Sequence, residues 1–457
     1  MASSMMSIED FGRRLRAREL TCEQVTNDCL QCVETDDPRL NAFILIAADE
    51  ARRQAREADR ELAAGRDRGA LHGVPIAIKD LLDMRGLPTT AASRVRDGHV
   101  ADRDAPAIAH LRQAGAVFVG KTNLHEFAFG TTNEDSAFGP TRNPLDPSRS
   151  PGGSSGGSAA SVATGMALAA VGTDTGGSVR IPAAACGIVG LKPSFGEISC
   201  DGVVPLSRTF DHVGPLARNV ADASLLYHAM LGDGGATTPA PMPVGGLRLA
   251  VPRPYFCDLL DDDVRACFER ALERLRTAGA RVADSEIHHA TDIAAVYMHI
   301  SFADAAAYHA VTLDTMPERY TEPVRLRLEM ARYVLAEDYV RALAGREVLR
   351  REVDAALAQH DALLLPTLPI PAPPIGASTV AVGRSTEPVR NMMLRLTQLF
   401  NVTGHPVVSV PMGRTPAGLP CGMQLVGCRM QTDTLLRVAL ACEAHVRGEL
   451  SSETTHA

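Results

Sequence analysis

The spacing of apolar and polar residues divides the chain into a helical beginning and a longer part in which strands and helices alternate. Over residues 7–65 apolar side chains recur at helical spacing between charged ones, and Ser7 and Thr21 stand where helix N-caps are expected. Over residues 71–83 apolar side chains alternate instead, and this predicted strand ends at Lys79. The pattern therefore predicts a helical N-terminal region followed by the first strand of a sheet.

The alternation of strands and helices continues to the end of the chain. Helix-and-strand pairs are predicted over 104–120 and 158–173, and a strand, a helix and a strand follow a Pro- and Gly-rich connector at 233–246. That last unit could form a small subdomain. Apolar strands return late in the chain, however, in HDALLLPTLP, HPVVSVPMG and GMQLVG, which favours an insertion into one fold. We predict an α/β fold: a single large domain with a mixed β-sheet core covered by helices on both faces.

Composition and charge exclude some classes of protein. The 457 residues are 45% hydrophobic, which suffices for a large core, and the formal net charge of −8 arises without a block of one sign. This balance argues against nucleic acid as the main partner. The ten cysteines are scattered through a chain that opens without a basic-then-apolar segment, so we expect reduced thiols and a cytoplasmic protein. Cys29 and Cys32 have redox or metal spacing, but no second pair completes a metal site.

The stretch from Ser150 to Thr173 carries no charged residue. Its Gly and Ser content predicts a buried loop, helix and strand rather than a membrane span, so no membrane partner is expected. Glycine clusters at 152–157 and 176–178 frame this stretch, and glycines let backbone N–H groups approach a ligand closely. Ser178 then lies on a turn between a strand and a helix, a layout that presents a nucleophile at a sheet edge.

These glycines do not form the common Gly-rich motifs. No Gly-Lys-Ser/Thr follows them as in a P-loop, and Val179 and Arg180 follow Ser178 where a nucleophile elbow needs glycine. Asp174 begins an Asp-Thr-Gly, but no second one supplies the paired carboxylate of an aspartic protease.

A serine hydrolase also needs a base, and no histidine stands in a motif that nominates it. A lysine at a strand end is usually a solvated charge. A buried lysine can instead become a neutral base near pH 7, because desolvation lowers its pKa. Lys79 together with Ser154 and Ser178 therefore supplies the missing chemistry.

The segments GVPIAIKD, SPGGSSGGSAA and GTDTGGSVRIPAAACGIVGLKPS closely resemble the amidase signature family of Ser-Ser-Lys amide hydrolases. Lys79 lies 75 residues before Ser154, and Ser178 lies 24 residues after it, as in that family. The resemblance extends from Leu71 through Pro193 and resumes in FNVTGHPVVSVPMG and GLPCGMQLVG. It implies one domain over 1–457, with a helical region 1–65, a catalytic core 71–232, a variable substrate-pocket region 246–395 and a return to the core at 396–445.

The resemblance also implies a mechanism. A neutral Lys79 would take a proton through Ser154, which follows a cis peptide bond, from the nucleophile Ser178. The resulting acyl-enzyme would be released by water. Backbone N–H groups would form the oxyanion hole at Thr175, Gly176, Gly177 and Ser178. Ser155, Asp174 and Arg180 would support the triad, and Phe127, Ala128 and Phe129 would line the acyl site.

The family name does not name a substrate. The aromatic pair in residues 127–129 favours small, fairly apolar amides, aryl or aliphatic, and also admits esters or carbamates. The alternative is the glutaminase-type A subunit of a tRNA-dependent amidotransferase. In such relatives an acidic residue precedes the segment matching FNVTGHP, whereas this chain has MMLRLTQL there, which disfavours glutamine.

Two other classes remain as alternatives. A noncatalytic complex subunit with the same fold is disfavoured because all three triad residues are present. A phosphate or nucleotide binder that uses the Gly-rich loops lacks the Lys-Ser/Thr motif. We expect no metal and no organic cofactor, while a homodimer stays open because the sequence does not say which apolar surface is exposed.

Overall fold

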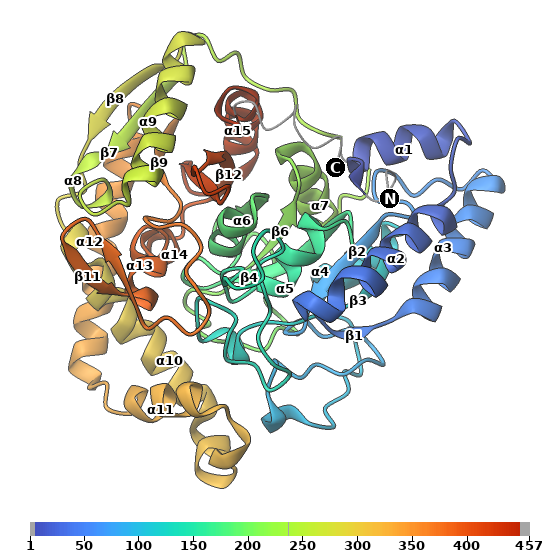
Figure 1. Cartoon of the computed structure of the whole chain (residues 1–457), viewed down its shortest axis with the longest axis horizontal. Coiled ribbons are helices and arrows are strands. Elements are labelled where there is room, and N and C mark those ends of the chain that lie inside the picture. The colour runs from blue at the N-terminus through green and yellow to red at the C-terminus, as the bar shows by residue number, and fades with distance from the viewer. Residues whose placement is uncertain (1–4, 236, 448–457) are drawn as a thin grey trace.

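The computed structural model describes residues 5–235 and 237–447, and within them eleven strands form one mixed sheet (Figure 1). In their order across the sheet the strands are β1 (Phe43–Ile46), β3 (Val117–Thr122), β2 (Pro75–Lys79), β4 (Ala169–Asp174), β6 (His212–Ala217), β5 (Val189–Lys192), β12 (Val407–Arg414), β13 (Pro420–Val426), β9 (Ala362–Pro366), β7 (Arg248–Pro252) and β8 (Arg281–Ser285). A separate hairpin pairs β10 (Thr379–Val382) with β11 (Ser385–Pro388).

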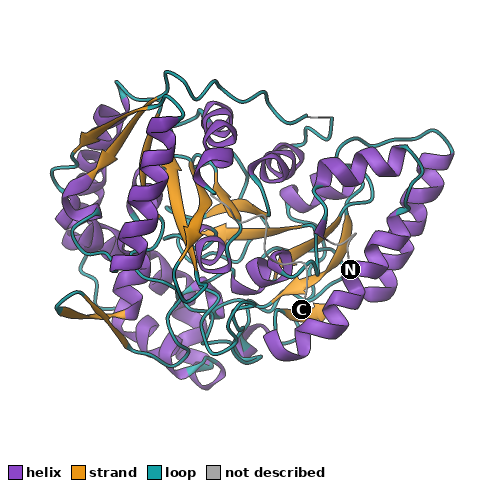
Figure 2. Ribbon diagram, turned by 45° about the horizontal axis from the view of Figure 1, so that its top comes forward, coloured by secondary structure: helices purple, strands orange, loops and turns teal. Residues whose placement is uncertain are grey.

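Helices surround the strands on both faces (Figure 2). They are α1 (Ile8–Arg16), α2 (Cys22–Leu40), α3 (Ala48–Ala63), α4 (Pro106–Gln113), α5 (Gly156–Ala163), α6 (Arg180–Cys186), α7 (Val220–Leu231), α8 (Arg253–Phe256), α9 (Asp262–Thr277), α10 (Ile293–Thr315), α11 (Glu322–Ala331), α12 (Ala336–Leu357), α13 (Val389–Arg395), α14 (Leu399–Thr403) and α15 (Thr432–Val446). The predicted α/β class, with a mixed sheet between helices, is confirmed.

The sheet is parallel near its two ends and antiparallel in the middle. Strand β2 runs parallel to β3 and β4, and β7 runs parallel to β8 and β9. The strands from β4 through β6, β5, β12 and β13 to β9 are antiparallel neighbours. Because β7 pairs with β9, the strand–helix–strand unit after the connector extends this one sheet, as the sequence favours.

The N-terminal region departs from the prediction at one place. Ser7 and Thr21 cap α1 and α2 as predicted, since their hydroxyls accept from the amides of Asp10 and Gln24. The prediction of helices alone over 7–65 is wrong at β1, which pairs antiparallel with β3 and forms one edge of the sheet. Its four residues FILI are too short for the period to distinguish a strand from the helices beside it.

The alternation of side chains along β2 decides which face of the sheet Lys79 joins. Ile76 and Ile78 pack in the larger core with α4, α7 and α15, whereas Ala77 packs in the smaller core with α2, α5 and α6. Successive strand residues point to opposite faces, so Lys79 points to the same face as Ala77, toward α5. The serines of the loop that leads into α5 lie on that face.

The region between β8 and β12 is mostly helical. Helices α10, α11 and α12 lie together on the side of the molecule away from α1–α3, with α13 and the β10–β11 hairpin beside them (Figure 1). In the described ranges, no helix has both the length and the apolar character needed to cross a membrane. All ten cysteines are free thiols in the structure.

Candidate active site

Lys79 is fully buried at the carboxyl end of β2. Its ammonium nitrogen Nζ lies 2.8 Å from Ser154 Oγ, 2.9 Å from Ser155 Oγ and 2.7 Å from Thr173 Oγ1. The parallel pairing of β2 with β4 aligns Ile78 with Val171, so the side chains that end the two strands meet. The structure thus brings together the predicted base and two of the predicted serines.

The environment of Lys79 favours its neutral form. Burial lowers the pKa of Lys79 to about 7, although the charges of Asp174 and Asp211 oppose this shift. The Ser155 hydroxyl donates to the Thr173 carbonyl at 3.1 Å, so Ser155 Oγ accepts a hydrogen bond from Lys79. A neutral amine fixed in this way can turn its lone pair toward Ser154.

Two close turns hold the serines. The peptide bond between Gly153 and Ser154 is cis, as the family resemblance implies. The Ser154 carbonyl accepts from the amide of His125 at 3.1 Å, and the Ser155 amide donates to the Ser178 carbonyl at 3.2 Å. Ser178 is 5% exposed, and within the described residues its hydroxyl makes no hydrogen bond. Lys79 and Ser154 are therefore hydrogen-bonded directly, whereas Ser178 is linked to this turn through its carbonyl, which accepts from the Ser155 amide.

The turn from Thr175 to Ser178 offers free amide donors. Within the described residues, the N–H groups of Gly176, Gly177 and Ser178 donate to no backbone carbonyl and no side chain. Gly177 has a φ of +135°, and a Cβ there would overlap Thr397 Oγ1, so only glycine fits. Amides of this kind beside a nucleophile are suited to stabilise an oxyanion.

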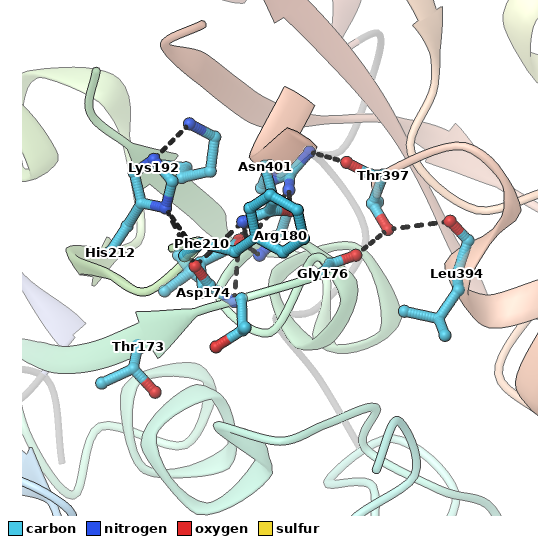
Figure 3. A network of polar contacts seen from close by, with 12 residues as sticks. Thr173, Asp174, Gly176, Arg180, Lys192, Phe210, His212, Leu394, Thr397 and Asn401 are labelled. Carbon is cyan, nitrogen blue, oxygen red and sulfur yellow. Dashed lines mark hydrogen bonds and ion pairs between the residues drawn. The ribbon is translucent and has the colours of Figure 1, made fainter. Parts of the chain in front are cut away.

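Asp174 and Arg180 form the buried support of this turn (Figure 3). The guanidinium binds both carboxylate oxygens, at 3.0 Å to Oδ2 and 2.9 Å to Oδ1. Burial alone would raise the pKa of Asp174, but the Arg180 charge outweighs it and holds that pKa well below its usual range. Arg180 also donates to Thr397 O, Asn401 Oδ1 and Gln424 Oε1. The supporting positions predicted for both residues are thus filled by an ion pair with no free donor on the guanidinium.

Several polar residues that complete the site are absent from the sequence-based prediction. Thr397 donates to the Gly176 carbonyl at 2.6 Å, and Asn401 donates to Asp174. Thr175 donates to Asp211 Oδ1 at 2.6 Å, and burial raises the pKa of Asp211 to about 6. A usable signal did exist for Gln424, the one polar side chain inside the apolar segment GMQLVG.

The three residues predicted to line the acyl site are all buried. Phe127 packs its ring against His309 and Tyr320. The Phe129 ring packs edge-on against Phe302, with centroids 5.1 Å apart. Ala128 lies between them and is buried. None of the three lines the two cavities described next, so their role in substrate binding stays a prediction.

Two cavities adjoin the catalytic turns. The first, of about 400 Å³, lies between α10 and α13 and includes Tyr297 and Leu394; we call it the α10–α13 cavity. The second, of about 390 Å³, includes Thr131 and Arg327; we call it the α11 cavity. A Cβ on Gly176 would lie 2.5 Å from Tyr297 Oη, and one on Gly153 would lie 2.9 Å from Thr131 C. Each cavity therefore has a wall in contact with one of the catalytic turns.

Comparison with known proteins agrees with this site. The Amidase family model matches residues 24–436. An amidase of Pseudomonas putida is 39% identical over 96% of this chain and 95% of its own length. The A subunit of the glutamyl-tRNA(Gln) amidotransferase of Geobacter metallireducens is 37% identical over 96% of each chain. A crystal structure of an amidase superposes with a TM-score of 0.92 at 37% identity, over 96% of this chain and 100% of that one.

The matched residues include the buried lysine, both serines and the glycine turn, and the match covers most of the chain. The fold also agrees with that of a solved amidase. The chain belongs to the amidase signature family and is a hydrolase of amide C–N bonds.

Proposed function

We propose that this protein hydrolyses small amides through an acyl-enzyme on Ser178. The observation that carries the proposal is the contact of 2.8 Å between a fully buried Lys79 and Ser154, beside a turn whose amides are free. A lysine whose pKa is about 7 is a competent base at neutral pH. No metal and no organic cofactor enters the proposed steps.

In the first step Ser178 Oγ attacks the carbonyl carbon, and its proton passes to Ser154 while the Ser154 proton passes to Lys79. The negative oxygen of the tetrahedral intermediate accepts hydrogen bonds from the amides of residues 176–178. The C–N bond then breaks, and the amine leaves with the proton that Lys79 returns through Ser154. Water repeats these steps on the ester and releases the acid, so Lys79 and both serines end as they began.

The α10–α13 cavity supports a substrate of modest size. Part of its wall is apolar and includes Leu259, Met298, Phe302 and Met392. Such a wall suits an aryl or short aliphatic group and also admits esters or carbamates of that size.

A second candidate is the glutaminase activity of an amidotransferase of the tRNA-dependent kind. The similarity to the Geobacter metallireducens protein supports it more directly than anything supports a free-standing hydrolase of apolar amides. The absence of an acidic residue in MMLRLTQL argues against it. Glu387 nevertheless lines the α10–α13 cavity and offers a carboxylate to an ammonium group. Under this candidate the protein would need partner subunits.

The test is turnover of one panel by the native protein and by Ser178→Ala. The panel contains an acyl-anilide, an aliphatic amide, an aryl carbamate, allophanate and glutamine. We expect kcat to fall at least about 10³-fold in the variant for every compound that the native protein cleaves. The exposed Ser199→Ala serves as the matched control and keeps its activity.

Each outcome separates the candidates. Preference for a compound other than glutamine supports the free-standing hydrolase, and glutamine as the sole substrate supports the glutaminase candidate. Full activity in Ser178→Ala would overturn the proposed mechanism.

A further inference from the structure

Arg390 lies where the two cavities meet. It lines both the α10–α13 cavity and the α11 cavity, and its own side chain is partly buried. Its guanidinium carbon lies 5.6 Å from the centre of the Phe129 ring. Within the described residues this guanidinium makes no hydrogen bond and no ion pair. A charged group that faces a cavity without a polar partner is unusual, because removing a charge from water costs free energy.

Two other arginines that line these cavities differ from Arg390 because each donates a hydrogen bond to a backbone carbonyl. Arg395 lines the α10–α13 cavity too, but it donates to the Tyr255 carbonyl at 2.9 Å and lies 3.8 Å from the centre of the Tyr255 ring. Arg327 lines the α11 cavity and donates to the Phe129 carbonyl. Of these three described guanidiniums, Arg395 and Arg327 make one hydrogen bond each and Arg390 makes none, so Arg390 has the most donors available to a ligand.

The acidic groups near Arg390 do not neutralise it. Asp135 pairs with His125 at 3.1 Å, and Glu134 accepts from the amide of Gly376 at 2.8 Å. Glu387 lines the same cavity as Arg390 but forms no ion pair with it in the part of the chain that the structure describes. Burial, with a smaller contribution from Arg327, lowers the pKa of Arg390 to about 10, so the group stays charged at neutral pH.

The cavity that holds Arg390 lies next to the turn that carries Ser178. Tyr297 and Leu394 line it, and both would contact a Cβ on Gly176, the first glycine of the oxyanion turn. A short substrate can therefore occupy the turn with its amide and extend along the cavity with the rest of its length. Such a substrate can meet the Arg390 guanidinium, which lines the same cavity.

We propose that Arg390 binds a carboxylate group of the substrate, so that the protein acts on short amides that also carry a carboxylate. This inference rests on the proposed hydrolysis of amides at Ser178 and narrows its substrate class. Guanidinium and carboxylate match in shape and charge, since two parallel N–H donors meet two oxygens. Because the Arg390 side chain is partly buried, solvent screens this pair less than at the surface, and the pair orients the amide at the turn.

The first experiment compares matched amides that differ by one carboxylate. One pair is succinamate and butyramide, with the carboxylate in the acyl part. The other pair is N-acetyl-β-alanine and N-propylacetamide, with the carboxylate in the amine part. We expect kcat/KM to favour the carboxylated member of one pair by about 10- to 100-fold. In Arg390→Met this preference disappears, while turnover of the neutral member changes less than about threefold.

Two variants act as controls. Arg390→Lys keeps the charge but loses the paired donors, so it should retain only part of the preference. Arg384→Met removes an exposed arginine from the β10–β11 turn, outside both cavities, and should leave the preference intact. An equal loss in Arg384→Met would mean that net charge alone is at work and would overturn the inference.

The second experiment measures binding without turnover. Calorimetric titration of succinate into Ser178→Ala is compared with the same titration into Ser178→Ala with Arg390→Met. We expect at least about a tenfold weaker Kd in the double variant. Arg390-dependent binding without any amide hydrolysis would leave the carboxylate site standing and overturn the proposed function. Ser178-dependent hydrolysis with no preference in either pair would leave the proposed function standing and overturn the carboxylate site.

Discussion

The catalytic turn and the α10–α13 cavity beside it each contain an arginine, and the two arginines differ in how many polar partners they have. Arg180 is fully buried beneath the turn, where it binds Asp174 and three other oxygen acceptors. Arg390 faces the cavity with one aromatic ring as its only described partner. The first region is closed and holds the groups that we propose cleave an amide. The second is open and is free to select which amide enters, which suits a family whose shared fold hosts many substrates.

The largest expected effect is the loss of the base. Lys79→Met should lower kcat by about 10⁴-fold for carboxylated and neutral amides alike, because both use the same proton transfer. In the native protein only the neutral amine accepts a proton, and its pKa of about 7 lies below that of free lysine. The rate should therefore rise with pH up to about 7 and level off about one unit above. A profile of kcat/KM that is flat from acidic to alkaline pH would contradict the assignment.

The next effect is on stability and tests whether the two arginines differ. Arg180→Met leaves the Asp174 carboxylate buried without its cation, so the free energy of unfolding should fall by about 3–5 kcal/mol. Arg390→Met breaks no ion pair and should change it by less than about 1 kcal/mol. Urea denaturation of both variants at neutral pH measures the contrast. If both variants lost the same free energy of unfolding, the hydrogen-bond networks would not explain a difference between the two arginines.

A smaller effect is expected where the two regions touch. In Gly176→Ala the new Cβ would lie 2.5 Å from Tyr297 Oη, so the turn must shift and kcat should fall by about 100-fold. Adding Tyr297→Phe removes the oxygen and should restore part of the rate. Steady-state kinetics of the single and double variants provide the check, and an absence of any restoration would place the conflict elsewhere.

The smallest effect concerns the hydroxyl that links the turn to the segment before α14. Thr397→Val removes the hydrogen bond of 2.6 Å to the Gly176 carbonyl. The free energy of unfolding should fall by about 1–2 kcal/mol, since a buried carbonyl loses its donor. Thermal or urea unfolding of this variant is compared with that of Thr35→Val, an exposed position. The control should change the free energy of unfolding by less than about 0.5 kcal/mol. Indistinguishable variants would show that this link is dispensable.

Much of the fold could be predicted because period and turn residues act locally. The strand that ends at Lys79 and the strand that ends at Asp174 both follow from apolar runs bounded by polar or glycine residues. β1 could not be separated from its helices, because its pairing with β3 depends on residues more than seventy positions later. Strand order across the sheet is likewise a matter of distant contacts.

The site residues likewise fall into those that the sequence can predict and those that it cannot. Lys79, Ser154 and Ser178 stand in recognisable motifs, so the sequence names them. Arg390 stands in no motif, and its importance depends on which groups fail to reach it, which only the assembled cavities reveal. Asp211 is an ordinary carboxylate until the fold buries it against Thr175.

Three of the acceptors that surround Arg180 are translated later than the residues of the catalytic triad. A ribosome that has translated the chain as far as β5 has already made the lysine, both serines and the glycine turn. Gln424, Asn401 and Thr397, which hold Arg180 and Gly176, are still untranslated, as are β12 and β13. The growing chain therefore carries every reacting group without the support that positions them. We therefore expect amide cleavage to begin only after β12 and β13 have been made and have paired within the sheet.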